Sequence, residues 1–578
     1  MFTPPPPRRL ATLLLVTPLI LAACGGGSSS SSGSGTVSPG EVPPASKESF
    51  VVAGYDVKGY RFQWNAVPGA THYELFEDPD GPGPLPEAQI GGELTGTTYA
   101  HSLATQLLHE RVNASYRLRS CDARGCSALT AALTPDLTQA IGRFEINKSS
   151  YTYDSHSRVA LSADGATLVV GFPGERSADG LSDAGAVYIF SRGTSDGIWQ
   201  QQAHLTAAYP MQDMAFGIDL ALSSDGDTLA VGAPRDSSNA RGINGDESNR
   251  DAPGSGAVHV FTRNGGNWSQ QAYVKARNTP QKVERCQIQF WRLPCDPVEF
   301  GTSVALSADG NLLAVGAPRE GTKGIHFFSP PDVAGTGAIH TYFRSNGAWI
   351  EQAHLKGTGP DANGKSVLIG SEVTLSNDGT TLATIGDDSN LYLFTQILGS
   401  WGQPFGVWQR PPNTSARYLA LSGDGKTLAY AASTSSASNG AVEKMQLQTL
   451  TRNDGAWMEE TLLTVSGSNG HSIGSLALSG DGRALAVGNT DDSSNAAGIN
   501  GDASHVTDDS SYSGAVNLYR RDGTTWSHSA YLKAPKPHKL ARFGSSVALS
   551  SDGKTLASSD NNQPNSEGSQ ITNAVYLY

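Results

Sequence analysis

The 578-residue sequence has few charges, few cysteines and no long apolar run. Charged residues make up 16%, whereas an average globular chain has roughly 25%. Because no apolar stretch reaches about 18 residues, no segment is predicted to cross a membrane as a helix. The formal net charge of -13 argues against nucleic-acid binding, which needs a basic surface. The 66 glycines and 31 prolines favour short strands joined by turns, so we expect an all-β protein.

The N-terminus has the features of an export signal. Arg8 and Arg9 precede an apolar run over residues 10–23, which is too short for a membrane span. The run ends in Leu21-Ala22-Ala23-Cys24, which resembles the lipobox of bacterial lipoproteins. The resemblance implies a signal peptide over residues 1–23, a lipid on Cys24 and, because Gly25 is not Asp, the outer membrane. An ordinary secretory signal is the alternative. Residues 24–46 then form a flexible Gly/Ser/Pro-rich linker.

The cysteines fit an oxidising compartment. Besides Cys24 the chain has two pairs close in sequence, Cys121 with Cys126 and Cys286 with Cys295. Neither pair has histidines at zinc-ligand spacing, so two local disulfides are the simpler prediction. Free thiols are the alternative.

Residues 47–135 are predicted to form a small β-sandwich. Large apolar and polar side chains alternate from Tyr60 to Trp64 and again around Tyr116, with turn residues between them. Trp64, the corner at Val67–Ala70 and Tyr116 make the segment resemble a fibronectin type III domain. That resemblance implies a spacer or adhesive module, with a tyrosine that bonds to the backbone at a corner.

The remainder of the chain is built from one repeated pattern. The pattern Leu-Ser-x-Asp-Gly-x-x-Leu, in which x is any residue, occurs seven times: Leu161–Leu168, Leu222–Leu229, Leu306–Leu313, Leu375–Leu382, Leu421–Leu428, Leu478–Leu485 and Leu549–Leu556. The Asp can bond to its own backbone and the Gly tolerates positive φ, so each copy predicts a tight hairpin. A third strand follows each hairpin. A fourth begins with Trp199, Trp268, Trp349, Trp457 or Trp526, while the shortest repeat offers Trp401 or Trp408.

Seven repeats of four strands predict a seven-bladed β-propeller over residues 139–578. The last repeat stops at Tyr578, after its third strand. Residues 139–146 alternate like an orphan fourth strand, so we expect them to complete the last blade and close the ring.

The repeats also resemble the FG-GAP repeat of integrin α-subunit propellers and its bacterial relatives. Phe216-Gly217, Phe300-Gly301 and Phe543-Gly544 open repeats, and Gly232–Pro234 and Gly316–Pro318 close second strands. In the integrin-type repeat a loop rich in aspartates binds calcium between the first two strands. Here that turn has one carboxylate, whereas calcium takes six to eight oxygens, so we expect no such site in the turns.

All variation in loop length falls on one face of the predicted propeller, where second strands connect to third strands and blades connect to each other. We expect this face to bind a partner, with neutral drift of surface insertions as the alternative. Two of its loops match at nine of ten positions, residues 237–246 and 493–502. Their oxygen ligands are weak calcium candidates: Asn239, Asn244, Asp246, Asn495, Asn500 and Asp502. Loops made rigid by Asx-turns are the alternative and the favoured interpretation.

These features predict a monomeric, non-enzymatic lipoprotein of the cell envelope without a cofactor, which binds an unknown protein or glycan for adhesion or scaffolding. The 13 histidines include no His-Glu-x-x-His spacing. The alternative is an envelope enzyme acting on polysaccharide, a lyase or hydrolase, for which carboxylates, His, Tyr or Arg would converge on the propeller channel.

Overall fold

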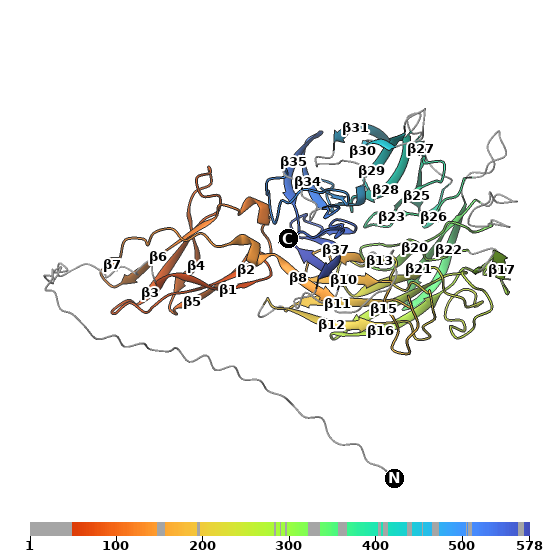
Figure 1. The fold of residues 1–578 in the computed structure, drawn as a ribbon, viewed down its shortest axis with the longest axis horizontal. Coiled ribbons are helices and arrows are strands. Elements are labelled where there is room, and N and C mark those ends of the chain that lie inside the picture. The colour runs from red at the N-terminus through yellow and green to blue at the C-terminus, as the bar shows by residue number, and fades with distance from the viewer. Residues whose placement is uncertain are drawn as a thin grey trace, which may run out of the picture.

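A β-sandwich and a β-propeller make up the described part of the chain (Figure 1). The computed structural model describes residues 49–146, 157–193, 197–282, 285–288, 291–294, 298–321, 336–356, 367–402, 406–408, 414–435, 442–453, 455–464, 473–504, 506, 511–564 and 571–578. The predicted signal peptide (1–23), Cys24 and the linker (24–46) lie outside these ranges. No helix within the described ranges is long and apolar enough to cross a membrane.

The sandwich packs a three-stranded sheet on a four-stranded sheet. The first has β1 (Val51–Asp56), β2 (Gly59–Gln63) and β5 (Thr98–Ser102); the second has β4 (Ala88–Leu94), β3 (His72–Asp78), β6 (Ser115–Asp122) and β7 (Gly125–Cys126). Alternation places Tyr60, Phe62 and Trp64 on one buried face, where the rings of Phe62 and Tyr116 lie 4.8 Å apart. Large aromatic side chains therefore fill a small core.

The structure tests two details predicted for the sandwich. Cys121 and Cys126 form a disulfide, as predicted. The hydroxyl of Tyr116 does not bond to the backbone as the family resemblance implied, because it donates to Glu77 Oε1 at 2.9 Å. Cys295 lies outside the described residues, so the Cys286–Cys295 disulfide stays a prediction.

Seven antiparallel sheets within the described residues form the propeller blades. Blade 1 has β9 (Arg158–Leu161), β10 (Thr167–Phe172), β11 (Ala186–Arg192) and β12 (Trp199–Leu205). Blade 2 has β13 (Leu220–Leu222), β14 (Thr228–Ala233), β15 (Ala257–Asn264) and β16 (Asn267–Val274). Blade 3 has β19 (Val304–Leu306), β20 (Leu312–Ala317), β21 (Ala338–Ser345) and β22 (Ala348–Lys356). A hairpin of β17 (Arg285–Ile288) and β18 (Trp291–Pro294) lies between blades 2 and 3 in sequence.

Blade 4 departs from the pattern because its fourth strand is split. It has β23 (Val373–Leu375), β24 (Thr381–Ile385) and β25 (Leu391–Ile397), and β25 pairs with both β26 (Ser400–Trp401) and β27 (Gly406–Trp408). Blade 5 has β28 (Thr414–Leu421), β29 (Thr427–Ser435), β30 (Val442–Asn453) and β31 (Ala456–Thr464). Blade 6 has β32 (Ile473–Leu478), β33 (Ala484–Asn489), β34 (Ala515–Asp522) and β35 (Thr525–Leu532).

Blade 7 closes the ring with an N-terminal strand, as the sequence predicts. It has β36 (Val547–Leu549), β37 (Leu556–Pro564) and β38 (Ile571–Leu577), and β38 pairs with β8 (Gly142–Ile146). Figure 1 shows orange β8 near the blue C-terminal strands. The prediction of a strand over 139–146 was wrong at its start, because residues up to Ala140 form the 3-10 turn η3 (Leu137–Ala140). The first strands of the blades contact each other in cyclic order, with β36 returning to β9.

The seven Asp-Gly turns have one geometry. In each turn the Ser hydroxyl donates to Asp Oδ1 at 2.5–2.7 Å. That oxygen also accepts the N–H two residues later at 2.9–3.0 Å. The glycines have φ of 64–72°. Backbone hydrogen bonds then link each turn to the next, and the last returns from Ser551 N to Ala163 O.

The FG and GAP glycines meet between neighbouring blades. A Cβ added to Gly232 would lie 2.2 Å from Gly301 O, and Gly301 has a φ of 90°. Phe300, beside this contact, is fully buried. The repeated Phe-Gly and Gly-Ala-Pro sequences therefore mark places where two backbones approach too closely for a side chain.

The sandwich packs directly against blades 6 and 7. Leu108, in the 3-10 turn η2 (Leu108–Glu110), joins one apolar core with Leu518, Leu532 and Tyr578 of the propeller. His109 Nε2 lies 2.8 Å from Ser529 Oγ. The sandwich, which the sequence analysis expects to be a spacer, is therefore fixed to the propeller through a shared core.

Lys58 of the sandwich is buried at this interface. Its Nζ donates to Lys554 O at 2.7 Å and to Thr555 Oγ1 at 3.2 Å. Burial lowers the pKa of Lys58 to about 7, and the nearby Asp552 only partly offsets that shift. The lysine therefore releases its proton on folding at mildly alkaline pH.

The free energy of unfolding is expected to rise with pH between about 7 and 10 because of Lys58. In this window the unfolded chain holds a proton that the folded chain has released, so higher pH favours folding by up to roughly 1.4 kcal/mol per pH unit. Lys58→Met should remove this part of the slope in urea unfolding measured across the window, whereas Lys554→Met, at an exposed position, should keep it. Parallel pH profiles for wild type and Lys58→Met would contradict the assignment.

Candidate functional site

Two matching loops stand on the face where second strands connect to third strands. We call this the loop face, and the opposite face, with the Asp-Gly turns, the turn face. The blade-2 loop spans residues 234–256 and the blade-6 loop spans 490–514. Each loop returns to the fourth strand of its own blade: Asn244 N donates to Tyr273 O, and Asn500 N to Tyr531 O, both at 2.7 Å. The shared sequence therefore produces a shared conformation.

A buried ion pair lies beneath the blade-2 loop. Asp236 Oδ1 accepts the Lys275 ammonium at 3.1 Å, the Tyr273 hydroxyl at 2.8 Å and Ser238 N at 2.8 Å. Lys275 Nζ also donates to Ser255 Oγ at 2.7 Å. The Asp236 and Lys275 side chains are at most 2% exposed. Through one carboxylate, the loop is thus fastened to the fourth strand and to the lysine that directly follows it.

The blade-6 loop has the same arrangement. Asp492 Oδ1 accepts Lys533 Nζ at 2.9 Å, the Tyr531 hydroxyl at 2.8 Å and Ser494 N at 3.0 Å. Lys533 Nζ also donates to Ser513 Oγ at 2.8 Å. Both members of this pair are buried as well.

The charge of each lysine keeps its aspartate ionised. Burial alone would raise the pKa of Asp236, but Lys275 and the hydrogen bond from Ser238 outweigh burial and lower it. The pKa of Asp492 is lowered in the same way by Lys533. Each pair therefore acts as a brace for its loop, and removing one partner would leave a buried charge unpaired.

Blade 1 has a glutamate in the corresponding place. Glu175 Oε2 accepts the Tyr188 hydroxyl at 2.7 Å, and Oε1 lies 3.2 Å from His204 Nε2. Tyr188 and His204 face each other across β11 and β12. A tyrosine and a histidine thus contact the acid here.

Blade 3 brings two histidines to the corresponding glutamate. His340 Nε2 lies 2.6 Å from Glu320 Oε2, and His354 Nε2 lies 2.7 Å from Oε1. Burial would raise the pKa of Glu320, but the hydrogen bonds from the two histidines outweigh it and lower the pKa. Lys356 and Asn278 also donate to Oε1, at 2.5 and 2.8 Å. The residue types suit zinc, but this oxygen already has three donors, so the group as folded is a hydrogen-bonded brace.

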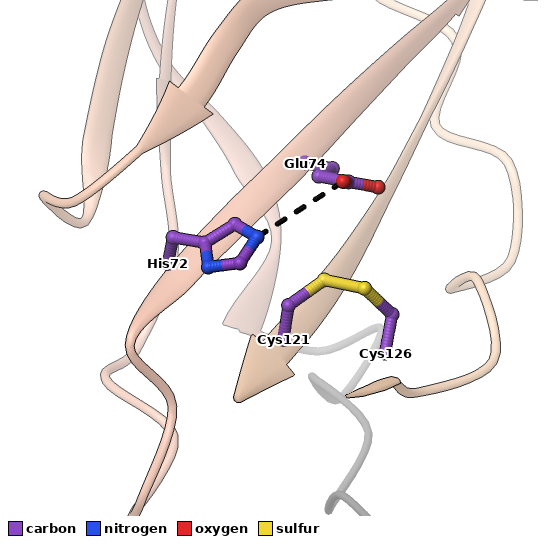
Figure 2. A group of neighbouring side chains, drawn as sticks. All are labelled: His72, Glu74, Cys121 and Cys126. Carbon is purple, nitrogen blue, oxygen red and sulfur yellow. Dashed lines mark ion pairs between the residues drawn. A yellow bond between two sulfur atoms is a disulfide. The ribbon is translucent and has the colours of Figure 1, made fainter. Parts of the chain in front are cut away.

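Figure 2 shows a second group of metal-ligating residue types, His72, Glu74, Cys121 and Cys126, in the sandwich. The two sulfur atoms are joined in the disulfide and are not thiolates. Glu74 also pairs with Arg119 at 2.5 Å. With the disulfide intact, this group offers no set of free ligands.

Part of the propeller sequence matches a known repeat family. Residues 199–261, from the fourth strand of blade 1 to the third strand of blade 2, match the family model of the FG-GAP repeat. The chain contains an FG-GAP repeat. No curated protein matches the sequence.

Two solved structures match most of the chain at low sequence identity. The β-propeller domain of Cps50 (Swd1) from Myceliophteria thermophila is 11% identical, with a TM-score of 0.40, and covers 75% of this chain and 99% of its own. A protein from Lactobacillus plantarum is 14% identical, with a TM-score of 0.39, and covers 70% of this chain and 94% of its own.

The calcium candidates predicted from the sequence lie in the two matching loops: Asn239, Asn244 and Asp246 in blade 2, and Asn495, Asn500 and Asp502 in blade 6. Asn244 Oδ1 accepts Tyr273 N, and Asn500 Oδ1 accepts Tyr531 N, both at 2.9 Å. Asp246 and Asp502 each accept the N–H two residues later at 2.9 Å. These four side chains thus bond within their own blades, and calcium binding stays a prediction.

The buried braces were missed by the sequence analysis, although the FG-GAP pattern carries a signal for them. Gly-Ala-Pro-Arg is followed by Asp236 in blade 2 and by Glu320 in blade 3. An acid at a fixed distance from a buried second strand indicates a paired carboxylate. Its partners lie on the third and fourth strands, so the strand register is needed to find them.

Carboxylates also lie just before the innermost strands, around the channel. Asp219 Oδ2 accepts Val304 N of the next blade at 2.8 Å, and Glu372 Oε1 accepts Leu419 N at 2.8 Å. Burial raises the pKa of Glu372 to about 7, and the charge of Asp219 adds to the shift. Arg158 Nε donates to Ile218 O at 3.0 Å. These groups connect neighbouring blades, whereas enzymatic use of the channel stays an untested alternative.

Proposed function

We propose that this chain is a non-enzymatic binding module of the bacterial cell envelope, and that the loop face of its propeller binds a protein or glycan partner. The observation that carries the proposal is the pair of braced loops. Each loop is fixed from below by a buried Asp–Lys–Tyr group, while polar residues such as Arg241, Asp246 and Asp502 remain exposed above. Rigid loops with exposed polar tips lose little entropy on binding.

The attachment to the envelope is also part of the proposal. A lipid on Cys24 would hold the protein at the outer membrane, and the linker up to residue 46 would carry the folded part away from the bilayer. The sandwich, which resembles a fibronectin type III domain, would extend this support because it shares a core with the propeller.

A bulky side chain on the loop face tests the binding surface. Ala497→Trp, at an exposed position of the blade-6 loop, is expected to reduce capture of envelope proteins or glycans by the purified protein at least about ten-fold, a loss of roughly 1.4 kcal/mol. Ala456→Trp, at an exposed position on the turn face of blade 5, is the matched control and should bind like wild type. Equal capture by both variants would place the binding surface elsewhere.

Fractionation tests the anchor. Cys24→Ala is expected to move the protein from the membrane to the soluble fraction or to block signal processing. Normal processing combined with membrane retention would contradict lipidation at Cys24.

A further inference from the structure

An arginine fills the seam between blades 2 and 3 on the turn face. Arg344 NH1 and Trp349 Nε1 both donate to Gln271 Oε1 of the preceding blade, at 3.1 and 2.9 Å. Arg344 NH2 donates to Thr228 Oγ1 at 3.1 Å, and Nε donates to Asn311 Oδ1 at 2.9 Å. The guanidinium also lies over the Trp349 ring at 5.3 Å. Arginine, tryptophan, glutamine and threonine thus form one unit.

The same arginine position recurs in five blades. The cross-strand pairs are Arg192–Trp199, Arg263–Trp268, Arg344–Trp349, Arg452–Trp457 and Arg521–Trp526. In blade 4 the residue facing Trp401 is Gln396. Blade 4 therefore keeps the tryptophan of the unit and lacks its arginine.

An open cleft of about 560 Å³ lies at the seam where this arginine is missing. Gln352, the counterpart of Gln271, lines the cleft and still accepts Trp401 Nε1 at 3.0 Å. Leu312 takes the place of Thr228 in its wall. Gln396 Nε2 is buried and has no hydrogen-bond partner among the described residues. The glutamine and the tryptophan of the arginine unit are thus present at this seam without the arginine, whereas the threonine is replaced by leucine.

The cleft carries negative charge that suits a cation. In the filled seam, the charge of Arg344 interacts with Asp309 of its own turn and with Asp225 of the preceding turn. The corresponding residues at the open seam are Asp378 and Asp309, and both line the cleft. Charge complementarity therefore favours a guanidinium as the occupant.

The rim of the cleft is apolar and exposed, which favours a polypeptide over free arginine. Phe343, which lines the cleft, is 45% exposed; Ile397 and Leu398, next to lining residue Gly399, are 71% and 100% exposed. Such apolar surface around a cleft is typical of protein interaction sites. The chain itself supplies a precedent, because Leu107 and Leu108 of the sandwich lie between blades 6 and 7.

We propose that the seam between blades 3 and 4 binds an arginine side chain of a partner polypeptide, with apolar residues beside that arginine resting on Phe343, Ile397 and Leu398. The guanidinium would take the position that Arg344 takes one seam earlier, between two aspartates and beside a glutamine and a tryptophan. This site lies on the turn face and does not depend on the proposed partner of the loop face.

Fluorine NMR of the full-length protein labelled with 5-fluorotryptophan tests the site, with the Trp401 signal assigned from Trp401→Phe. The probes are the peptide acetyl-Ala-Leu-Arg-Leu-Ala-amide, the same peptide with uncharged citrulline replacing arginine, and acetyl-arginine-amide. The arginine peptide is expected to shift the Trp401 signal saturably, at least about ten-fold more tightly than either other probe.

Gln396→Arg is the matched variant, because five blades already carry arginine at that position. It should fill the seam and abolish the peptide-induced shift while leaving the unfolding temperature at or above that of wild type. Equal binding of the citrulline peptide, undiminished binding by Gln396→Arg, or no saturable shift up to about 10 mM peptide would overturn the proposal. Equal affinity for acetyl-arginine-amide would overturn the assignment to a polypeptide.

Discussion

Replacing residues 142–146 with Gly-Ser-Gly-Ser-Gly is expected to unfold the propeller or convert it to aggregates. These residues form β8, the fourth strand of blade 7. Phe144 packs against Phe190 and Trp199 of blade 1, with ring centroids 4.9 and 5.4 Å apart. Losing one such phenylalanine costs about 3–5 kcal/mol, and the replacement also removes a strand, so the loss approaches the roughly 5–15 kcal/mol that stabilises a typical domain.

Thermal unfolding and size-exclusion chromatography measure this effect. The unpaired edge of β38 should lower the melting temperature and shift the protein to larger species. The same five-residue replacement within residues 25–46, which are already rich in Gly and Ser, is the control and should change neither measurement. A monomeric β8 variant with the melting temperature of wild type would show that β8 does not fasten the ring.

Lys275→Met is expected to destabilise the protein by roughly 3–5 kcal/mol, because Asp236 would keep a buried charge without its partner. Lys356→Met is the matched control: its side chain is 39% exposed, and its partner Glu320 keeps two histidine donors, so we expect a change of no more than about 1 kcal/mol. Replacing both partners, as Asp236→Leu with Lys275→Met, should recover much of the loss because no unpaired charge remains.

Urea unfolding of the three variants provides the measurement. Similar losses for Lys275→Met and Lys356→Met would show that burial of the ion pair has no special effect. A double variant as unstable as Lys275→Met alone would show that packing, rather than unpaired charge, accounts for the loss.

The ring was predictable because the repeat places the same turn at every blade. In Leu306–Leu313 the Ser hydroxyl, the Asp carboxylate and a glycine with positive φ specify the hairpin locally. The same local chemistry in six further copies gives the number of blades. The closing strand was predictable because apolar and polar residues alternate before blade 1, and the last repeat lacks a fourth strand. The strand is shorter than predicted because η3 takes up its first residues.

The braces and the docked sandwich could not be predicted in the same way, because they depend on contacts between distant residues. Asp236 and Lys275 are 39 positions apart and meet only when three strands are in register. Lys58 bonds to Thr555 across 497 positions, and nothing near either residue in sequence indicates the pairing. Gln396 becomes informative only after the cross-strand pairs show arginine at its position in five other blades.

The joint between sandwich and propeller determines how the molecule would respond to a mechanical load. β8 follows the sandwich directly and runs antiparallel to β38 over five register pairs, from Asn573–Ile146 to Leu577–Gly142. Tension applied through the sandwich pulls β8 along its own axis, whereas its hydrogen bonds lie across that axis. The bonds are therefore sheared together rather than opened one after another, and the strand that closes the ring also resists extension.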